Sequence, residues 1–186
     1  MIPLRKNKLF KVHEKLFVGN NSECFFNEKT GWAVIHACKH PCHQISVGYR
    51  GNLSKNHPKY LINEKGSHLF LNMVDMNQTI SHEFTEPIIT TTLDFIEKNI
   101  EEKNVLTHCN LGFSRSPALA LLFWAKRKSS LNNASYQKAK TEFIKIFPKY
   151  FPRIGIDSYL NLYWSELRWK LKFLGEKMKL AEIKSC

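Results

Sequence analysis

Long hydrophobic runs are absent from this chain of 186 residues. The longest apolar stretch, "ALALLFWA" at 118–125, is far too short to cross a bilayer, which needs about 20 such residues. The opening "MIPLRKNKLFKVHEK" also lacks the apolar segment of a signal peptide. Cysteine occurs five times, an odd number at irregular spacing that does not suit a disulfide framework. We therefore expect a soluble, cytoplasmic protein without a transmembrane segment.

Arginine is also scarce, with 6 among the 28 basic residues, although the formal net charge is +12. An anionic partner such as nucleic acid would account for a basic chain. Proteins that read nucleic acid favour arginine, however, because its guanidinium group makes bidentate contacts. We therefore interpret the charge as a solvated, lysine-rich surface and keep nucleic-acid binding as the less favoured alternative.

The chain has no internal repeat, linker or low-complexity segment, and 43% of its residues are hydrophobic. Its length suits one domain with a sizeable core. We predict a single domain over residues 1–186, with its core at about 8–175 and a basic helical extension at about 175–186.

Predicted strands alternate with predicted helices along the chain. The strands lie at 15–20, 31–38, 68–74 and 104–107, and residues 40–66 are predicted to be a long loop with little regular structure. Between about 85 and 103, one helical face carries Ile89, Leu93, Ile96 and Ile100. Further helices are predicted at 116–127, at 133–147 and from about Asp157 to the end. This alternation predicts an α/β fold with a central, mostly parallel sheet flanked by helices.

One stretch, "HCNLGFSRSP" at 108–117, joins a predicted strand to a predicted helix. Gly112 permits a turn that other residues resist, and the helix N-terminus points its amides and dipole back toward Cys109. Arg115 adds a planar fork that suits two phosphate oxygens. A thiol in such a field ionises readily, and the thiolate is a nucleophile. This order of residues favours a phosphate site over a buried structural cysteine beside an unrelated arginine.

The sequence His108-Cys109, five residues, then Arg115-Ser116 resembles the signature of the cysteine-dependent protein tyrosine phosphatases. The short chain resembles their dual-specificity subgroup. Residues 12–20 are similar to the opening strand of that subgroup, and 147–160 to the segment before its final core helix, whereas residues 40–66 match poorly. The resemblance implies a single-domain α/β fold of the protein tyrosine phosphatase-like, dual-specificity type.

The resemblance also implies a role for each residue of the motif. Cys109 would attack phosphorus and form a phosphocysteine, and Ser116 would assist its breakdown. His108 would order the loop and favour the thiolate. No metal and no organic cofactor are implied. The phosphate oxygens would be held by the Arg115 side chain and by the backbone amides of Asn110, Leu111, Gly112, Phe113, Ser114 and Arg115.

A general acid is expected on a separate loop before the motif, and Asp75 is the candidate. It follows a predicted strand and lies 34 residues before Cys109. In many relatives the acid sits one or two places further on, where this chain has Met76 and Asn77. The alternative is that Asp75 caps a turn. Two other aspartates are less favoured: Asp94 is expected to face solvent on a helix, and Asp157 to cap the last helix.

The segment "HACKHPCH" brings together residue types that bind zinc: His36, Cys38, His40, Cys42 and His43. Strand alternation through its first residues would point adjacent side chains to opposite faces. No second Cys/His pair follows at zinc-finger spacing. We therefore expect no metal here, but a strand end and a loop that border the active site.

The five residues at 110–114, none of which is basic, limit the classes of substrate that the site would accept. Relatives that act on inositol lipids tend to carry lysine there, so we expect no such substrate. Gly112-Phe113 before Arg115 resembles the related RNA 5′-triphosphatases, but those generally dispense with the aspartic acid. A non-catalytic phosphate-binding module would lack the cysteine, the arginine or the acid. We expect hydrolysis of phosphotyrosine, and of phosphoserine or phosphothreonine, in a phosphorylated protein partner.

Overall fold

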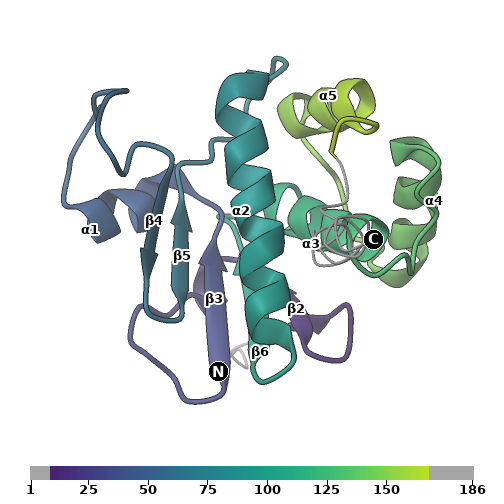
Figure 1. The fold of residues 1–186 in the computed structure, drawn as a ribbon, viewed down its shortest axis with the longest axis horizontal. Coiled ribbons are helices and arrows are strands. Elements are labelled where there is room, and N and C mark those ends of the chain that lie inside the picture. The colour runs from purple at the N-terminus through teal and green to yellow at the C-terminus, as the bar shows by residue number, and fades with distance from the viewer. Residues whose placement is uncertain (1–8, 168–186) are drawn as a thin grey trace, which may run out of the picture.

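The computed structural model describes residues 9–167, which form one sheet with helices packed against it (Figure 1). Its six strands are β1 (Phe10–Lys11), β2 (Leu16–Gly19), β3 (Trp32–His36), β4 (Ile62–Lys65), β5 (His68–Leu71) and β6 (Asn104–His108). Its α-helices are α1 (Gln44–Val47), α2 (His82–Ile100), α3 (Arg115–Lys126), α4 (Tyr136–Ile146) and α5 (Ile154–Tyr163). Two short helical turns are η1 (Asn21–Glu23) and η2 (Lys39–His43).

The strand order in the sheet is β1-β2-β6-β3-β5-β4. The four inner strands β2, β6, β3 and β5 are parallel to one another, whereas the edge strands β1 and β4 pair antiparallel with β2 and β5. This confirms the predicted α/β class with a mostly parallel sheet. Because parallel strands end at the same edge of a sheet, the segments that follow Gly19, His36 and His108 meet there.

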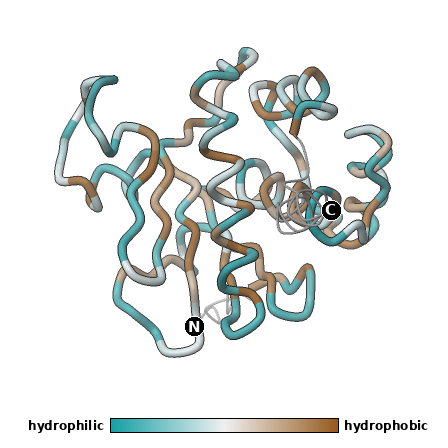
Figure 2. Tube along the Cα trace, viewed as in Figure 1, coloured by the Kyte–Doolittle hydropathy of each residue, from teal (hydrophilic) through white to brown (hydrophobic). Residues whose placement is uncertain are grey.

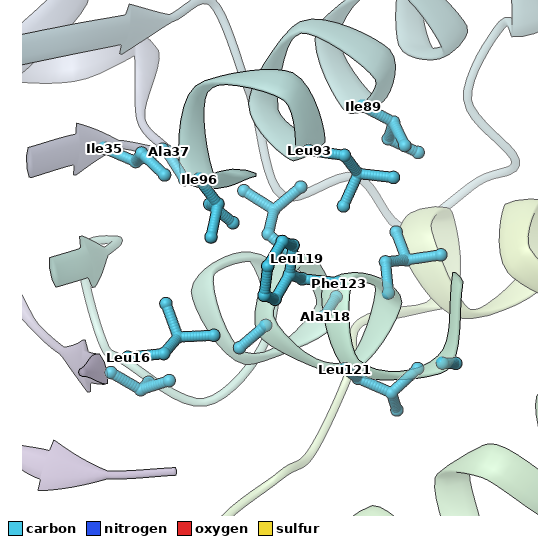
Figure 3. Close-up of a cluster of buried hydrophobic side chains, with 14 of the residues drawn as sticks. Leu16, Ile35, Ala37, Ile89, Leu93, Ile96, Ala118, Leu119, Leu121 and Phe123 are labelled. Atoms are coloured by element: carbon cyan, nitrogen blue, oxygen red, sulfur yellow. The ribbon is translucent and has the colours of Figure 1, made fainter. Parts of the chain in front are cut away.

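One face of the sheet packs against the helices and forms the main core. Ile89, Leu93 and Ile96 of α2 are each at most 3% exposed and point toward α3, where Leu119 and Phe123 are fully buried (Figure 3). Hydrophobic and hydrophilic segments alternate along α2 in Figure 2. The helical face predicted from the spacing of apolar residues is therefore confirmed. From the sheet, this core includes Leu16, Ala33, Ile35, Leu69, Leu71 and Val105.

The opposite face of the sheet carries an unusual group of rings. Side chains alternate between faces along a strand, so the neighbours of the core-facing residues point away from the helices. These neighbours are His36 of β3, His68 and Phe70 of β5, and His108 of β6, all buried. The segment around Cys24 and the η2 turn cover them.

Residues 40–66 contain more regular structure than the long loop with little regular structure that the sequence predicts. They contain most of η2, the single-turn helix α1 and the strand β4, which pairs with β5 through a turn at Gly66. β4 has the sequence "INEK", and such a short, polar edge strand has no apolar run to reveal it. The two-residue strand β1 escaped prediction for the same reason.

The last described helix also differs from its prediction. α5 begins at Ile154, three residues earlier than expected, and ends at Tyr163. The remainder of the predicted long helix, and the predicted extension at 175–186, lie outside the described residues except for the turn at 164–167. Within residues 9–167, no helix combines the length and the apolar character that crossing a membrane requires.

Candidate active site

Cys109 lies directly after β6, one residue beyond the strand, and its side chain is 1% exposed. Its sulfur accepts two hydrogen bonds, from the backbone amide of Gly112 at 3.3 Å and from the Ser116 hydroxyl at 3.2 Å. Both donors come from within seven residues of the sulfur. Donors aimed at a sulfur stabilise it as a thiolate, which is the form that can attack an electrophile.

The loop at 110–114 is tightly folded against the end of β2. Gly112 has φ +80°, and a Cβ there would lie 3.0 Å from the carbonyl oxygen of Gly19. The same carbonyl accepts from the Cys109 amide at 3.4 Å, and its oxygen lies 3.3 Å from the Ser116 hydroxyl oxygen. Glycine is therefore required at 112 both by the backbone conformation and by the close approach of the two segments.

Several backbone donors of this loop have no acceptor. Among the described residues, the amides of Asn110, Leu111, Phe113 and Ser114 donate to no protein group. α3 begins at Arg115 and no side chain caps its N-terminus. Free amides together with the positive end of a 12-residue helix form an anion-binding site.

Arg115 is the first residue of α3, and its side chain is 7% exposed. Its guanidinium group donates to the Met73 carbonyl at 3.0 Å and to Asn110 Oδ1 at 2.7 Å. Its Nε lies 3.2 Å from Asp75 Oδ2, as an ion pair without the alignment of a hydrogen bond. These contacts hold the guanidinium group beside the loop.

Asp75 reaches the same loop from the other side of the sheet edge, four residues after β5 ends. Ser114 donates its hydroxyl to Asp75 Oδ1 at 2.7 Å, and Ser114 in turn accepts from the Arg153 amide at 3.1 Å. The Asp75 side chain keeps 23% of its surface exposed. A carboxyl group on a separate loop therefore lies beside the 110–114 loop, in contact with both Arg115 and Ser114.

The other two aspartates have partners on the helices. Asp157 accepts from the Tyr136 hydroxyl and from Lys140 Nζ, each at 2.7 Å, so it joins α5 to α4. The N-cap of α5 is Arg153, and the expectation that Asp157 caps this helix is wrong. Asp94 accepts from Arg127 at 2.6 Å on the surface of α2.

The residues of "HACKHPCH" do not converge as a set. His40 contacts Gln44 at 2.8 Å and His43 contacts Tyr49 at 3.0 Å, both within the covering segment. The His40 carbonyl accepts from Asn110 Nδ2 at 3.0 Å, so this segment touches the loop as the sequence suggested.

His36, by contrast, turns inward beneath the loop. Its Nδ1 lies 2.8 Å from Nε2 of His108 and 3.5 Å from Sγ of Cys24. Burial lowers the pKa of His36 to about 4, so its imidazole is neutral near pH 7. The sequence had no signal that joined Cys24 to these histidines.

An apolar rim surrounds the loop, and the sequence did not reveal it. Leu111 and Phe113 of the loop are 55% and 39% exposed. Phe151 is 73% exposed and is held beside them because its amide donates to the Phe113 carbonyl at 2.8 Å. Val74, next to Asp75, is 49% exposed. Large exposed apolar side chains gathered around a polar site are typical of a surface that binds a partner or substrate.

No protein-family model and no curated protein sequence matches the chain. Solved structures do match it. The human tyrosine phosphatase-like serine/threonine/tyrosine-interacting protein has a TM-score of 0.59 and 17% identity, over 87% of this chain and 98% of that one. Human DUSP28 has a TM-score of 0.55 and 16% identity, over 86% and 94%. PTPMT1, solved in complex with PI(5)P, has a TM-score of 0.53 and 17% identity, over 84% and 94%. The described chain therefore has the fold of the dual-specificity phosphatases within the protein tyrosine phosphatase superfamily.

Proposed function

We propose that this protein is a cysteine-dependent phosphatase that hydrolyses phosphomonoesters, with phosphotyrosine in proteins as its preferred substrate. One observation supports the proposal: four chemical groups meet at the loop 110–114. They are a sulfur that accepts two hydrogen bonds, four free backbone amides of the loop, a guanidinium group and a carboxyl group. Each of these groups corresponds to one requirement of phosphoryl transfer, namely a nucleophile, an oxyanion cradle and an acid.

In the first step, the Cys109 thiolate attacks phosphorus, the S–P bond forms and the P–O bond to the substrate breaks. Asp75 gives its proton to the departing oxygen, so that an alcohol or phenol leaves. The loop amides and Arg115 bind the nonbridging phosphate oxygens and stabilise the negative charge that these oxygens carry in the transition state. Arg115 must exchange its contact with Asp75 for the phosphate, which leaves the Asp75 carboxylate to take up from solvent the proton that it then gives to the leaving oxygen.

In the second step, water attacks phosphorus and the S–P bond breaks, releasing inorganic phosphate. The Asp75 carboxylate now accepts the proton of the water, because the first step left it ionised. Ser116 lies 3.2 Å from the sulfur and donates to it, which stabilises the departing thiolate.

The apolar rim supports an aromatic phosphomonoester as the substrate. Phe113 and Phe151 offer exposed rings beside the loop, and aromatic rings pack favourably on one another. A phosphorylated tyrosine would place its phosphate in the cradle and its ring against these side chains. The loop residues 110–114 include no basic side chain, which does not suit a substrate with several further phosphates.

The test compares three substrates in parallel on the purified protein: a phosphotyrosine peptide, a phosphoserine peptide and a 5′-triphosphate RNA. We expect the highest kcat/KM on the phosphotyrosine peptide and no turnover by Cys109→Ser. Faster release of phosphate from the RNA would contradict the proposed substrate class and favour the RNA 5′-triphosphatase alternative. Phosphate binding without turnover of any substrate would instead identify a non-catalytic phosphate-binding module.

A further inference from the structure

Four side chains that can bind a metal ion converge beneath the phosphate loop. They come from four separate segments: Cys24 follows η1, His36 ends β3, Cys42 lies in η2 and His108 ends β6. Their ligand atoms all lie within 4.8 Å of one another. Three of the four residues are buried, and Cys24 is half-buried.

The sheet itself brings the two histidines together. His36 and His108 are register partners on the neighbouring parallel strands β3 and β6. Both side chains point to the face away from the helices, because their neighbours along each strand belong to the helical core. Cys24 and Cys42 approach the same face from the segments that cover it, and their sulfurs are 3.8 Å apart.

The two distances that involve sulfur match those of a tetrahedral zinc site. Zinc binds sulfur at about 2.3 Å and nitrogen at about 2.0–2.1 Å, so its ligands lie about 3.8 Å apart for two sulfurs and about 3.6 Å apart for sulfur and nitrogen. The observed values are 3.8 Å between the two sulfurs and 3.5 Å between Cys24 Sγ and His36 Nδ1. The two histidine nitrogens are 2.8 Å apart, and zinc would widen this contact by about 0.5 Å.

We propose that Cys24, His36, Cys42 and His108 form a structural zinc site of the Cys₂His₂ type. This site is distinct from the set of five residues in "HACKHPCH", of which it uses two. The sequence expectation of no metal rested on those five residues and on the resemblance to the phosphatases, and neither considered Cys24 or His108 as a ligand.

Hydrogen bonding alone accounts poorly for the same contacts. His36 Nδ1 faces both Cys24 Sγ and His108 Nε2. In either tautomer this nitrogen has one hydrogen or one lone pair, so it can make one of the two contacts as a full hydrogen bond. A divalent cation between the groups accepts a lone pair from each of them and balances the charge of two thiolates.

The surroundings of His36 also suit a metal ligand. Its other nitrogen, Nε2, lies 3.0 Å from Nδ1 of His68, and an N–H donated from Nε2 to His68 leaves the lone pair of His36 Nδ1 free for a metal. Ligating histidines commonly donate their second N–H in this way. Phe70 and Phe26 stack on the imidazole at 4.2 Å and 5.2 Å between centroids, which fixes the ring and shields it from water.

The place of the site in the chain indicates what it does. His108 directly precedes Cys109, so a metal bound to His108 ties the base of the phosphate loop to β3 and to both covering segments. The ion would act as a cross-link among four segments that no disulfide joins, and would position the loop without touching the substrate.

The experiment measures zinc in the purified full-length protein, handled under reducing conditions without metal-affinity chromatography. We expect about one zinc per chain by elemental analysis. Cys24→Ser and Cys42→Ser should each reduce the zinc content at least tenfold. The matched control is Cys38→Ser, a buried cysteine that contacts Cys42 but is not one of the four proposed ligands, and this variant should keep the ion.

Cobalt provides a second readout that does not depend on whether a variant folds. The metal-free wild type, titrated with Co²⁺, should develop thiolate-to-cobalt charge-transfer and tetrahedral d–d absorption, and zinc should abolish both. Cys109→Ser should give the same spectra, because the nucleophile is not a ligand. That result would separate this site from the proposed phosphatase activity, which the same variant lacks.

Three results would overturn the proposal. The first is a wild-type protein that takes up neither zinc nor cobalt. The second is zinc that persists in both Cys24→Ser and Cys42→Ser. The third is a Cys24–Cys42 disulfide, detected by mass spectrometry in protein isolated with its thiols trapped, since these two residues would then be a redox pair instead of metal ligands.

Discussion

Replacing Asp75 by asparagine should have two opposite effects, one on turnover and one on phosphate binding. Asp75 Oδ2 lies 3.2 Å from Arg115 Nε, and Asp75 Oδ1 accepts from Ser114 at 2.7 Å. In the free protein the carboxylate therefore occupies part of the guanidinium group that phosphate needs. In catalysis the same carboxyl group is proposed to protonate the leaving oxygen. Asp75→Asn removes the proton that the leaving oxygen needs. It also weakens the competition between residue 75 and phosphate for the Arg115 guanidinium group.

The gain in phosphate binding follows from the contact with Arg115. This contact is an ion pair without hydrogen-bond alignment, and partly exposed ion pairs contribute about 0.2–1 kcal/mol. An uncharged amide in place of the carboxylate therefore competes with phosphate less strongly by up to about 1 kcal/mol. Because about 1.4 kcal/mol corresponds to a factor of ten, the inhibition constant for inorganic phosphate should fall by up to about fivefold.

The loss in turnover depends on the leaving group. A general acid typically contributes about 10²–10⁴-fold. Tyrosine leaves as a phenol with a pKa near 10, so its departure depends strongly on protonation. Nitrophenolate is a better leaving group and depends on protonation less. Asp75→Asn should therefore lower kcat by about 100-fold or more on a phosphotyrosine peptide, and by clearly less on nitrophenyl phosphate.

The assay measures kcat on both substrates and the inhibition constant of phosphate, for the wild type and the variant. Asp157→Asn is the matched control, because Asp157 is also part-buried and hydrogen-bonded but holds Tyr136 and Lys140. It should lower thermal stability and leave the substrate ratio unchanged. An unchanged phosphate constant, with equal losses on both substrates in Asp75→Asn, would refute the assignment of Asp75.

Three further predictions concern the loop and one buried lysine. Arg115→Lys loses the donors to Met73 and Asn110 and should lower kcat on aryl phosphates by at least about 100-fold; near-normal turnover would show that the guanidinium group lies outside the transition state. Gly112→Ala places a Cβ 3.0 Å from the Gly19 carbonyl oxygen in a backbone with φ +80°. It should lower the free energy of unfolding, measured in denaturant, by about 1–3 kcal/mol and nearly abolish turnover. An active, fully stable variant would contradict the loop geometry. Burial lowers the pKa of Lys126 to about 8 from its ordinary 10.5, so the unfolded chain holds a proton that the folded one releases between these values. This contribution makes the free energy of unfolding rise with pH over that range, and Lys126→Met should flatten the rise measured between about pH 8 and 10.5. An equally steep rise in the variant would exclude Lys126 as its source.

The sequence by itself determined the parts of this protein that depend on neighbours along the chain. The approach of Arg115 to Cys109 follows from a strand end, a glycine at positive φ and a helix start, all within ten residues. The buried face of α2 follows from the spacing of its apolar residues, since a helix repeats every 3.6 residues. Such relations were predictable because connectivity and helical geometry leave few alternatives.

Tertiary structure alone decided which separate segments meet. The pairing of Asp75 with Arg115 requires that β5, β3 and β6 end at one edge of the sheet, whereas the residue count between them allows other arrangements. The cluster of Cys24, His36, Cys42 and His108 depends on β3 lying beside β6 in matching register, and on the packing of two covering segments. Side-chain alternation predicts the face on which each histidine lies, but the neighbour across the sheet is chosen by the folding of the whole chain.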